Sequence, residues 1–257
     1  MADTWSPLRA VTLDLWGTIL QLRDPEGKIE RRREMLLAAI RAAGHECSLD
    51  QLRAGFRAAQ REIEYLSALE YRDVGPPGRW AELMRQLGFL PDSVPFSAVQ
   101  AAYEDLTLEF LPPLMEGVSE AIERLAQRYR LGLICNTGYT GGRVLRHVLK
   151  RHDLARYFTV LTFSNEFGWL KPDPRIFHHT LEQLDARPGQ AVHVGDVEEL
   201  DVDGARAAGL YSARYSPERD NDGALASKAD LVFFDWAEFC DLIETQPLFA
   251  TGMGHGG

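Results

Sequence analysis

The chain of 257 residues is poor in cysteine. Its three cysteines, Cys47, Cys135 and Cys240, are odd in number and widely separated. This spacing supports neither a disulfide framework nor a CxxC metal site, so we expect reduced thiols. Hydrophobic residues make up 45% of the chain, which is enough to build a sizeable core and excludes a disordered or collagen-like protein.

Basic residues are also scarce. The sequence has 28 Lys and Arg against 38 Asp and Glu, a formal net charge of −10. This balance argues against nucleic acid or an anionic membrane surface as the main partner, because phosphate-rich surfaces attract Lys and Arg. We expect a small-molecule anionic substrate to need a local positive centre, either a bound cation or a few well-placed basic side chains.

Long apolar runs are missing as well. No stretch approaches the roughly 20 apolar residues that span a bilayer. The first seven residues, MADTWSP, carry an acid where a signal peptide carries base, and no apolar run follows them. We therefore expect a cytoplasmic protein. The sequence leaves its oligomeric state open.

The pattern of residues changes twice along the chain. Residues 9–16 predict a buried strand that ends in the turn at Gly17. From residue 24 to about 110 the pattern is helical, with helices over 29–43 and 49–69 and a breaker at 73–78. From residue 112 onward strands and helices alternate. Strands are expected at 131–135, 158–163, 191–194 and 230–234, and helices at 118–129, 142–150, 175–184 and 203–208.

Repeated strand–helix units predict an α/β fold, namely a doubly wound parallel sheet with helices on both faces. The helical stretch interrupts this pattern, so we expect it to be an inserted all-helical cap. The predicted domains are a discontinuous α/β core over 1–21 and 109–246, a helical cap over 22–108, and a disordered Gly-rich tail over 247–257.

Polar residues follow several predicted strands at their carboxyl ends. They are Asp14, the segment 135–138 (CNTG), Lys171, and Asp196 with Asp201. In a parallel sheet these ends converge on one crevice. We therefore expect carboxylates, a lysine and hydrogen-bond donors to face one another there.

These positions fall in four ordered motifs through which the sequence resembles the haloacid dehalogenase superfamily. Residues 13–18 (LDLWGT) resemble the family's first motif, 133–137 (LICNT) the second, 168–177 (GWLKPDPRIF) the third, and 194–209, which contains Gly195-Asp196 and Asp201, the fourth. The resemblance covers nearly the whole chain. It implies a Rossmann-like core with a cap of the type inserted between the first and second motifs.

The resemblance also implies roles for individual residues. Asp14 would be the nucleophile and Lys171 the side chain that neutralises charge. Mg²⁺ would be held by Asp14, the backbone carbonyl of Trp16 and Asp196, with Asp201 supporting it from behind. Residues expected to bind substrate or phosphate are Trp16, Thr18, Cys135, Asn136 and Thr137.

Two positions depart from the family pattern. Trp16 stands where family phosphatases carry a second Asp as general acid and base, and an indole does not exchange a proton at neutral pH. The lost help is worth about 10²–10⁴-fold in rate. Cys135 stands where Ser or Thr is expected, and a thiol is a weaker hydrogen-bond donor; a buried apolar role is its simpler interpretation.

The predicted function is a Mg²⁺-dependent phosphatase that acts on a small phosphate ester or acyl phosphate through an aspartyl-phosphate. Haloacid dehalogenases, which carry an aromatic residue at the position of Trp16, are the alternative, as is a non-catalytic binding member of the fold. Asp196 argues against a metal-free dehalogenase, because it would leave carboxylates facing each other. A phosphonoacetaldehyde hydrolase needs a cap lysine, and Lys28, near the edge, is the only lysine in the cap.

Other residues admit plainer interpretations. His193 lies in an apolar strand and is interpreted as a hydrogen-bonded core histidine. The run of arginines at 31–33 reads as a solvated helix face. Four residues that flank the breaker are candidates for setting specificity, although the sequence does not name a substrate: Tyr71, Arg72, Arg79 and Trp80.

Overall fold

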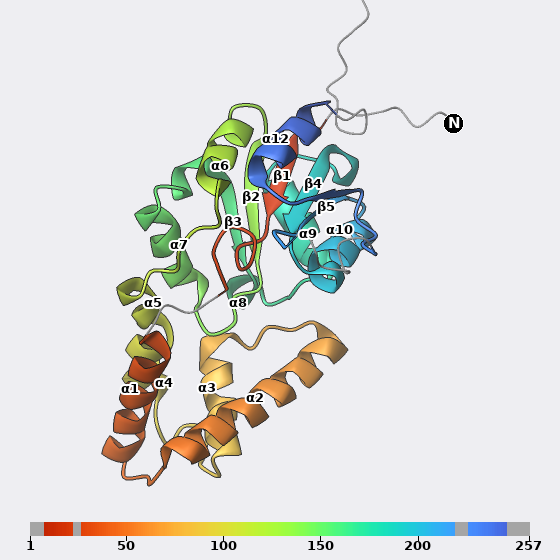
Figure 1. The fold of residues 1–257 in the computed structure, drawn as a ribbon. Helices are drawn as coiled ribbons and strands as arrows, with labels where there is room; N and C mark the ends of the chain where they lie inside the picture. Colours follow the sequence, from red (N-terminus) through yellow and green to blue (C-terminus); the bar gives the residue numbers. More distant parts are fainter. Residues whose placement is uncertain (1–7, 23–26, 219–225, 246–257) are drawn as a thin grey trace, which may run out of the picture.

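The computed structural model describes residues 8–22, 27–218 and 226–245, and its centre is a six-stranded parallel sheet (Figure 1). The strand order is β3-β2-β1-β4-β5-β6, and every neighbouring pair is parallel. The strands are β1 (Ala10–Leu13), β2 (Arg130–Cys135), β3 (Phe158–Phe163), β4 (Ala191–Gly195), β5 (Tyr211–Tyr215) and β6 (Leu231–Phe233). The prediction of a doubly wound parallel sheet is confirmed.

The sequence pattern does not predict one of the six strands. The strand β5, with the sequence YSARY, lies between β4 and β6 and pairs with both. The aromatic Tyr211 and the charged Arg214 are only partly buried, so the strand lacks the continuous apolar run that marked the others. The predicted tail over 247–257 and the first seven residues lie outside the described part of the chain.

The sheet buries both of its faces, as a parallel sheet requires. All four residues of β1 are buried. Val11 and Leu13 join the core cluster that includes α6 (Val118–Ala126), α7 (Gly142–Arg151) and α12 (Trp236–Thr245). Ala10, which points to the opposite face, joins the cluster formed with α9 (Pro174–Gln183) and α10 (Asp203–Ala207). Figure 1 shows these two helix layers on either side of the sheet.

Residues 28–109 form a separate group of helices, which we call the helical block. It lies below the carboxyl ends of the strands in Figure 1 and has its own apolar cluster, centred on Trp80, Leu83 and Tyr103. Its elements are α1 (Lys28–Ala42), α2 (Leu49–Glu70), α3 (Gly75–Gln86), α4 (Phe96–Gln100), the π-helical turn η1 (Ala101–Asp105) and α5 (Leu106–Glu109). Its position matches the predicted insertion, whose exact domain boundaries stay a prediction.

Local sequence explains where the helices of the block begin. Ser48 caps α2: its hydroxyl accepts the Gln51 backbone N–H at 3.2 Å, while the Gln51 side chain accepts the Ser48 N–H at 2.8 Å. The predicted breaker at 73–78 proves to contain the start of α3. Prolines are tolerated in a first helical turn, where backbone N–H groups have no helical partner.

The loop between α2 and α3 joins the helical block to the sheet-containing part. The Leu170 N–H donates to the Tyr71 carbonyl at 2.7 Å, and the Asp73 N–H donates to the Gly168 carbonyl at 3.2 Å. The guanidinium carbons of Arg72 and Arg175 lie 4.1 Å and 3.1 Å from the centre of the Trp169 ring. The block is therefore fixed directly beside the third sequence motif.

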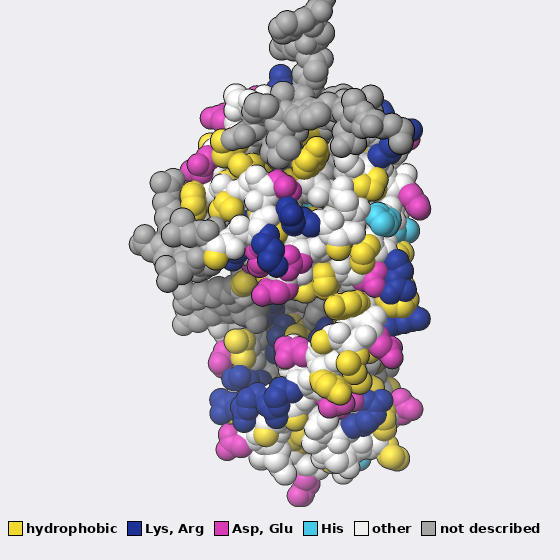
Figure 2. Space-filling view, turned by 90° about the vertical axis from the view of Figure 1, so that its right-hand side faces the viewer, with side chains coloured by type: hydrophobic (Ala, Val, Ile, Leu, Met, Phe, Trp, Pro, Cys, Tyr) yellow, Lys and Arg dark blue, Asp and Glu magenta, His cyan; other side chains and the backbone are white. Residues whose placement is uncertain are grey.

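The surface has no broad face of one charge on the side shown in Figure 2, where basic and acidic side chains lie close together over both parts of the molecule. No helix among the described residues is both long and apolar enough to cross a membrane.

Candidate active site

The carboxyl ends of the central strands carry the predicted polar residues. Asp14 directly follows β1, Asn136 follows β2 and Asp196 follows β4. The strands β1 and β4 are neighbours at the point where the chain order of the sheet reverses, which is where open α/β sheets bind ligands. The parallel register thus gathers residues from distant parts of the sequence at one edge.

A buried ionic cluster occupies this edge. The Lys171 Nζ donates to Asp14 Oδ1 and to Asp201 Oδ1, each at 2.5 Å. Asp14, Lys171 and Asp201 are only 6%, 2% and 2% exposed. Both of these carboxylates are thus charge-paired with one ammonium group in a region nearly free of water, where electrostatic interactions are strong.

His193 supports the cluster from inside β4. Its Nε2 lies 3.1 Å from Asp201 Oδ1 and its Nδ1 lies 2.9 Å from the Thr12 hydroxyl on β1. Both ring nitrogens therefore have partners, in agreement with the interpretation of His193 as a hydrogen-bonded core histidine. Burial lowers the pKa of His193 and so favours the neutral ring. Its hydrogen bond to Asp201 acts in the opposite direction but does not outweigh burial.

The three carboxylates of the cluster differ in pKa because their surroundings differ. Burial, followed by the charges of Asp201 and Asp196, raises the pKa of Asp14 to about 7 in spite of Lys171. Burial and the Asp201 charge raise the pKa of Asp196 to about 6. Burial alone would raise the pKa of Asp201 as well, but Lys171 and His193 outweigh it and lower that pKa well below the ordinary value.

Lys171 stays protonated in this setting. Burial lowers the pKa of its ammonium group, but the carboxylates of Asp14 and Asp201 outweigh burial and raise it above the ordinary value. The side chain is therefore a fixed positive charge and not a proton donor near neutral pH.

The three carboxylates are placed so that they could share a cation. Asp14, Asp196 and Asp201 can each offer one oxygen, and these oxygens lie within 4.8 Å of one another. When all three are ionised, Lys171 compensates one negative charge and leaves two. Oxygen donors with that residual charge fit a hard divalent ion such as Mg²⁺.

Two glycines allow the acids to approach the backbone. A Cβ atom on Gly17 would lie 2.2 Å from Asp196 Oδ2, and Gly17 has a φ of 81°, in the left-handed region that favours glycine. A Cβ atom on Gly195 would lie 2.1 Å from Cγ of Asp201. A larger residue at Gly17 or Gly195 would therefore clash with the carboxylate beside it. The Thr18 hydroxyl adds a 3.3 Å hydrogen bond to Asp196.

The second motif splits into an apolar and a polar part. Cys135 is fully buried in the main core cluster, and burial raises the pKa of its thiol well above the ordinary value. It has the apolar role that a free cysteine often takes. Asn136 instead clamps the backbone of Lys171: its side chain donates to the Lys171 carbonyl at 3.1 Å and accepts the Lys171 N–H at 2.9 Å.

Thr137 meets residues that sequence reasoning missed. Its hydroxyl donates to Asp73 Oδ2 at 3.2 Å, and its backbone N–H donates to the Ser164 hydroxyl at 3.0 Å. Ser164 also donates to Asp73 Oδ2, at 2.5 Å. Asp73 belongs to the loop that connects α2 and α3, so this network ties the helical block to the second motif. A Ser after an apolar strand was the only available signal for Ser164.

Trp16 is half-buried and packs against the main core cluster. It directly precedes the turn in which the Gly17 N–H donates to the Leu20 carbonyl at 2.7 Å. Trp16 is not among the residues that line the two cavities beside the acidic cluster. Because an indole does not exchange a proton near neutral pH, position 16 supplies no general acid or base.

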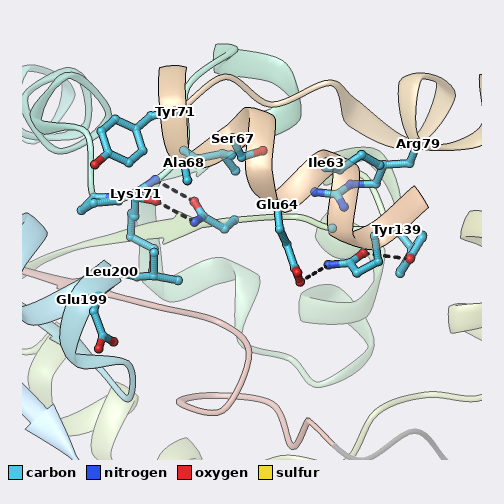
Figure 3. Close-up of a pocket in the computed structure, with 15 residues that line it drawn as sticks. Ile63, Glu64, Ser67, Ala68, Tyr71, Arg79, Tyr139, Lys171, Glu199 and Leu200 are labelled. Carbon is cyan, nitrogen blue, oxygen red and sulfur yellow. Dashed lines mark hydrogen bonds between the residues drawn. The ribbon is translucent and has the colours of Figure 1, made fainter. Parts of the chain in front are cut away.

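Two cavities reach the cluster. The first, of about 450 Å³, lies between the helical block and the sheet and includes Lys171, Asn136, Leu200 and the α2 side chains of Glu64 and Ser67 in its wall (Figure 3). The second, of about 380 Å³, includes Gly17 and Asp196. The first has the size and the mixed apolar and polar lining typical of a small-molecule site.

The sheet topology and the buried lysine–carboxylate cluster define an α/β protein with a buried ionic site at the carboxyl edge of its sheet. A model of the haloacid dehalogenase-like hydrolase family matches residues 8–209. The chain therefore belongs to this family of hydrolases, as the four motifs indicated.

Similar proteins agree with this membership. Haloacid dehalogenase-like hydrolase domain-containing protein 3 of Homo sapiens is 31% identical over 212 residues, 80% of each chain. Glyceraldehyde 3-phosphate phosphatase of Methanopyrus kandleri is 27% identical over 210 residues, 80% of this chain and 83% of that one. The solved 2-haloacid dehalogenase of Pseudomonas syringae shares the fold, with a TM-score of 0.64, 22% identity, and coverage of 92% of this chain and 98% of that one.

Proposed function

We propose that this hydrolase is a Mg²⁺-dependent phosphatase that forms an aspartyl-phosphate on Asp14. The observation that carries the proposal is the ion pair of Asp14 with Lys171 at 2.5 Å, beside two further carboxylates at the ligand-binding edge of the sheet. Relatives named as phosphatases, including those for glyceraldehyde 3-phosphate and phosphoserine, support the same chemistry.

The proposed reaction has two displacement steps. A carboxylate oxygen of Asp14 attacks phosphorus, and the bond from phosphorus to the leaving-group oxygen breaks with its electron pair remaining on that oxygen. Water then attacks the phosphorus of the aspartyl-phosphate, phosphate leaves, and the Asp14 carboxylate is regenerated. Lys171 stabilises negative charge on the transferring group in both steps without giving up its proton.

A divalent cation fits the acidic cluster. Asp14, Asp196 and the Trp16 carbonyl would hold it, with Asp201 oriented behind them by Lys171 and His193. The ion would supply charge neutralisation that lets an anionic phosphate approach three carboxylates.

The missing acid at Trp16 restricts the leaving group. Because no side chain at that position protonates the departing oxygen, the rate should fall steeply as the leaving group becomes more basic. Aryl and acyl phosphates are therefore the favoured classes. We also assign the helical block the role of cap, since it covers the carboxyl ends of the strands and closes the 450 Å³ cavity.

The test is release of phosphate from 4-nitrophenyl phosphate with and without Mg²⁺, using wild type, Asp14→Asn and the control Asp50→Asn, which alters an exposed acid on α2. We expect Mg²⁺-dependent turnover that Asp14→Asn abolishes and Asp50→Asn leaves unchanged. Turnover that survives Asp14→Asn, or none in wild type, would overturn the proposal.

The aromatic Trp16 favours one second candidate, attack of Asp14 on carbon as in a dehalogenase. That reaction forms an ester, which water cleaves at the carboxyl carbon. In isotopically labelled water under single turnover, the label would then enter Asp14. A phosphatase places the label in the released phosphate instead. Halide release from 2-haloacids, unaffected by chelator, would support the dehalogenase.

A further inference from the structure

Arg79 is a buried cation that lacks an anionic partner in the described part of the chain. It belongs to α3, is only 8% exposed, and makes no hydrogen bond or ion pair with any described residue. Its Nε is buried without a hydrogen-bond partner. Arg85, six residues further along α3, is paired with Glu82 and largely solvated. The two arginines of one helix therefore have opposite environments.

The Arg79 guanidinium group contacts an aromatic ring. Its guanidinium carbon lies 5.6 Å from the centre of the Tyr139 ring. The Tyr139 hydroxyl donates to Gln60 Oε1 at 2.9 Å, and the Gln60 amide donates to Glu64 at 2.7 Å. These two hydrogen bonds fix the position of the Tyr139 ring. The Glu64 carboxylate therefore bonds to Gln60 and not to Arg79 (Figure 3).

Burying a guanidinium group without a hydrogen-bonding anion is unfavourable, because the lost hydration is not replaced. A cation–π contact with an aromatic ring offsets only part of this lost hydration energy. Proteins tolerate such a group where a ligand completes it, and functional sites commonly trade stability for binding. Arg79 lies in such a place, since it lines the same 450 Å³ cavity as Lys171.

The two cations lie on opposite sides of this cavity in Figure 3, with side chains of α2 between them. Lys171 is committed to Asp14 and Asp201. The stretch of wall that Ile63 and Leu170 contribute is apolar, and Glu199 lies on the Lys171 side. The Arg79 end is therefore the part of the cavity that offers a free positive charge to a ligand.

We propose that Arg79 binds a second anionic group, a carboxylate or a phosphate, on the leaving group of the substrate. A guanidinium group suits this task because its planar fork bonds both oxygens of a carboxylate or phosphate. The substrate class is then a small phosphomonoester that carries a further negative charge at its far end. The assignment rests on the proposed phosphatase reaction for the first phosphate, but its test does not depend on turnover alone.

The kinetic test compares two aryl phosphates that differ at the para position, one with a carboxylate and one with a carboxamide. Wild type should prefer the carboxylate, and Arg79→Met should lower kcat/KM for it by about 10- to 100-fold, as expected for loss of a charged hydrogen bond. The carboxamide should change less than about threefold. Arg79→Lys should retain part of the preference. Arg85→Met, with the same substitution on the same helix, should change neither substrate.

Calorimetry provides a readout without turnover. Aryl phosphonates, which this reaction cannot cleave, would carry a carboxylate, a second phosphonate or a carboxamide at the para position. We expect the charged ligands to bind wild type at least about 10-fold more tightly than the carboxamide, with the better charged group identifying the natural anion, and Arg79→Met to remove the difference. Equal binding of charged and neutral ligands by wild type, or a preference that Arg79→Met leaves intact, would overturn the assignment. Failure of wild type to turn over any phosphate would contradict the proposed phosphatase only.

Discussion

Lys171 and Arg79 are two buried cations in the wall of one cavity, and they differ in what surrounds them. Lys171 comes from the third motif and bonds two carboxylates at 2.5 Å, whereas Arg79 comes from the helical block and bonds no described anion. In the proposed phosphatase reaction, Lys171 stabilises the transferring group and already has its counter-charges within the protein. Arg79 would gain its counter-charge from the substrate. Under this proposal the edge of the sheet carries out the chemistry, and the helical block sets selectivity.

The largest effect should come from breaking the first member of this pair. Lys171→Met leaves Asp14 and Asp201 buried without their counter-charge, and we expect an activity loss of about 10³-fold and a loss of about 3–5 kcal/mol in unfolding free energy. Arg79→Met removes a charge that has no anion to leave behind, so stability should stay constant or rise by about 1 kcal/mol. Urea unfolding of both variants checks the contrast. A loss of stability in Arg79→Met as large as that in Lys171→Met would show that Arg79 is a structural residue.

The rigidity of the sheet edge can be tested at Gly17. Alanine there adds strain at φ 81° and places Cβ against Asp196, whereas alanine at Gly44, with φ 84°, meets nothing within 4 Å. Each change should cost about 1–2 kcal/mol in stability from the left-handed backbone. Only Gly17→Ala should also displace Asp196, with an expected activity loss of about 10²-fold. Parallel measurement of Tm and kcat would reject this account if both variants lost activity equally.

The connection between the two regions can be loosened at Asp73. Asp73→Ala removes the acceptor for the hydroxyls of Ser164 and Thr137, which should lower the unfolding free energy by about 2 kcal/mol and raise KM more than it lowers kcat. Asp92→Ala, an exposed change in the same block, is the control. A selective fall in kcat with KM unchanged would assign Asp73 to the chemical step instead of to docking of the block.

The smallest effect concerns pH and the start of α9. Hydrogen bonds from Arg175 hold the pKa of Asp173 below its ordinary value of 3.8, so the carboxylate stabilises the fold above that value and loses its contribution as pH falls through the lowered pKa. Asp173 also caps α9, with the Arg175 N–H at 2.9 Å. Asp173→Asn should therefore cost about 1 kcal/mol at pH 7 and progressively less below about pH 4. Urea titrations across this range check the convergence, and a constant difference would contradict it.

The sequence alone predicted the sheet and its acidic edge, because β1 and β4 are apolar runs that end in acids and the order of motifs is fixed by the chain. It missed β5, since Tyr211 and Arg214 break the apolar pattern. It also missed Asp73 and Ser164, which meet across 91 residues through packing that no local pattern encodes. Arg79 appeared only as one of several candidates, because its significance is the absence of a partner, and that absence is visible only once the neighbours are placed.

In the proposed reaction Asp14 must be ionised to attack phosphorus. Burial raises the pKa of Asp14 to about 7, so its carboxylate depends on a positive charge close by, which Lys171 supplies. Burial also raises the pKa of Asp196 to about 6, and the proposed Mg²⁺ would keep this carboxylate ionised.

The central claim is that Asp14 becomes covalently phosphorylated, and the most direct test is acid quenching during turnover of an aryl phosphate, followed by mass spectrometry of the peptide that contains Asp14. We predict phosphate on Asp14 in wild type, trapped only when Mg²⁺ is present, and none at that position in Asp14→Asn. Rapid turnover by wild type with phosphate on another residue, or on none, would contradict the account.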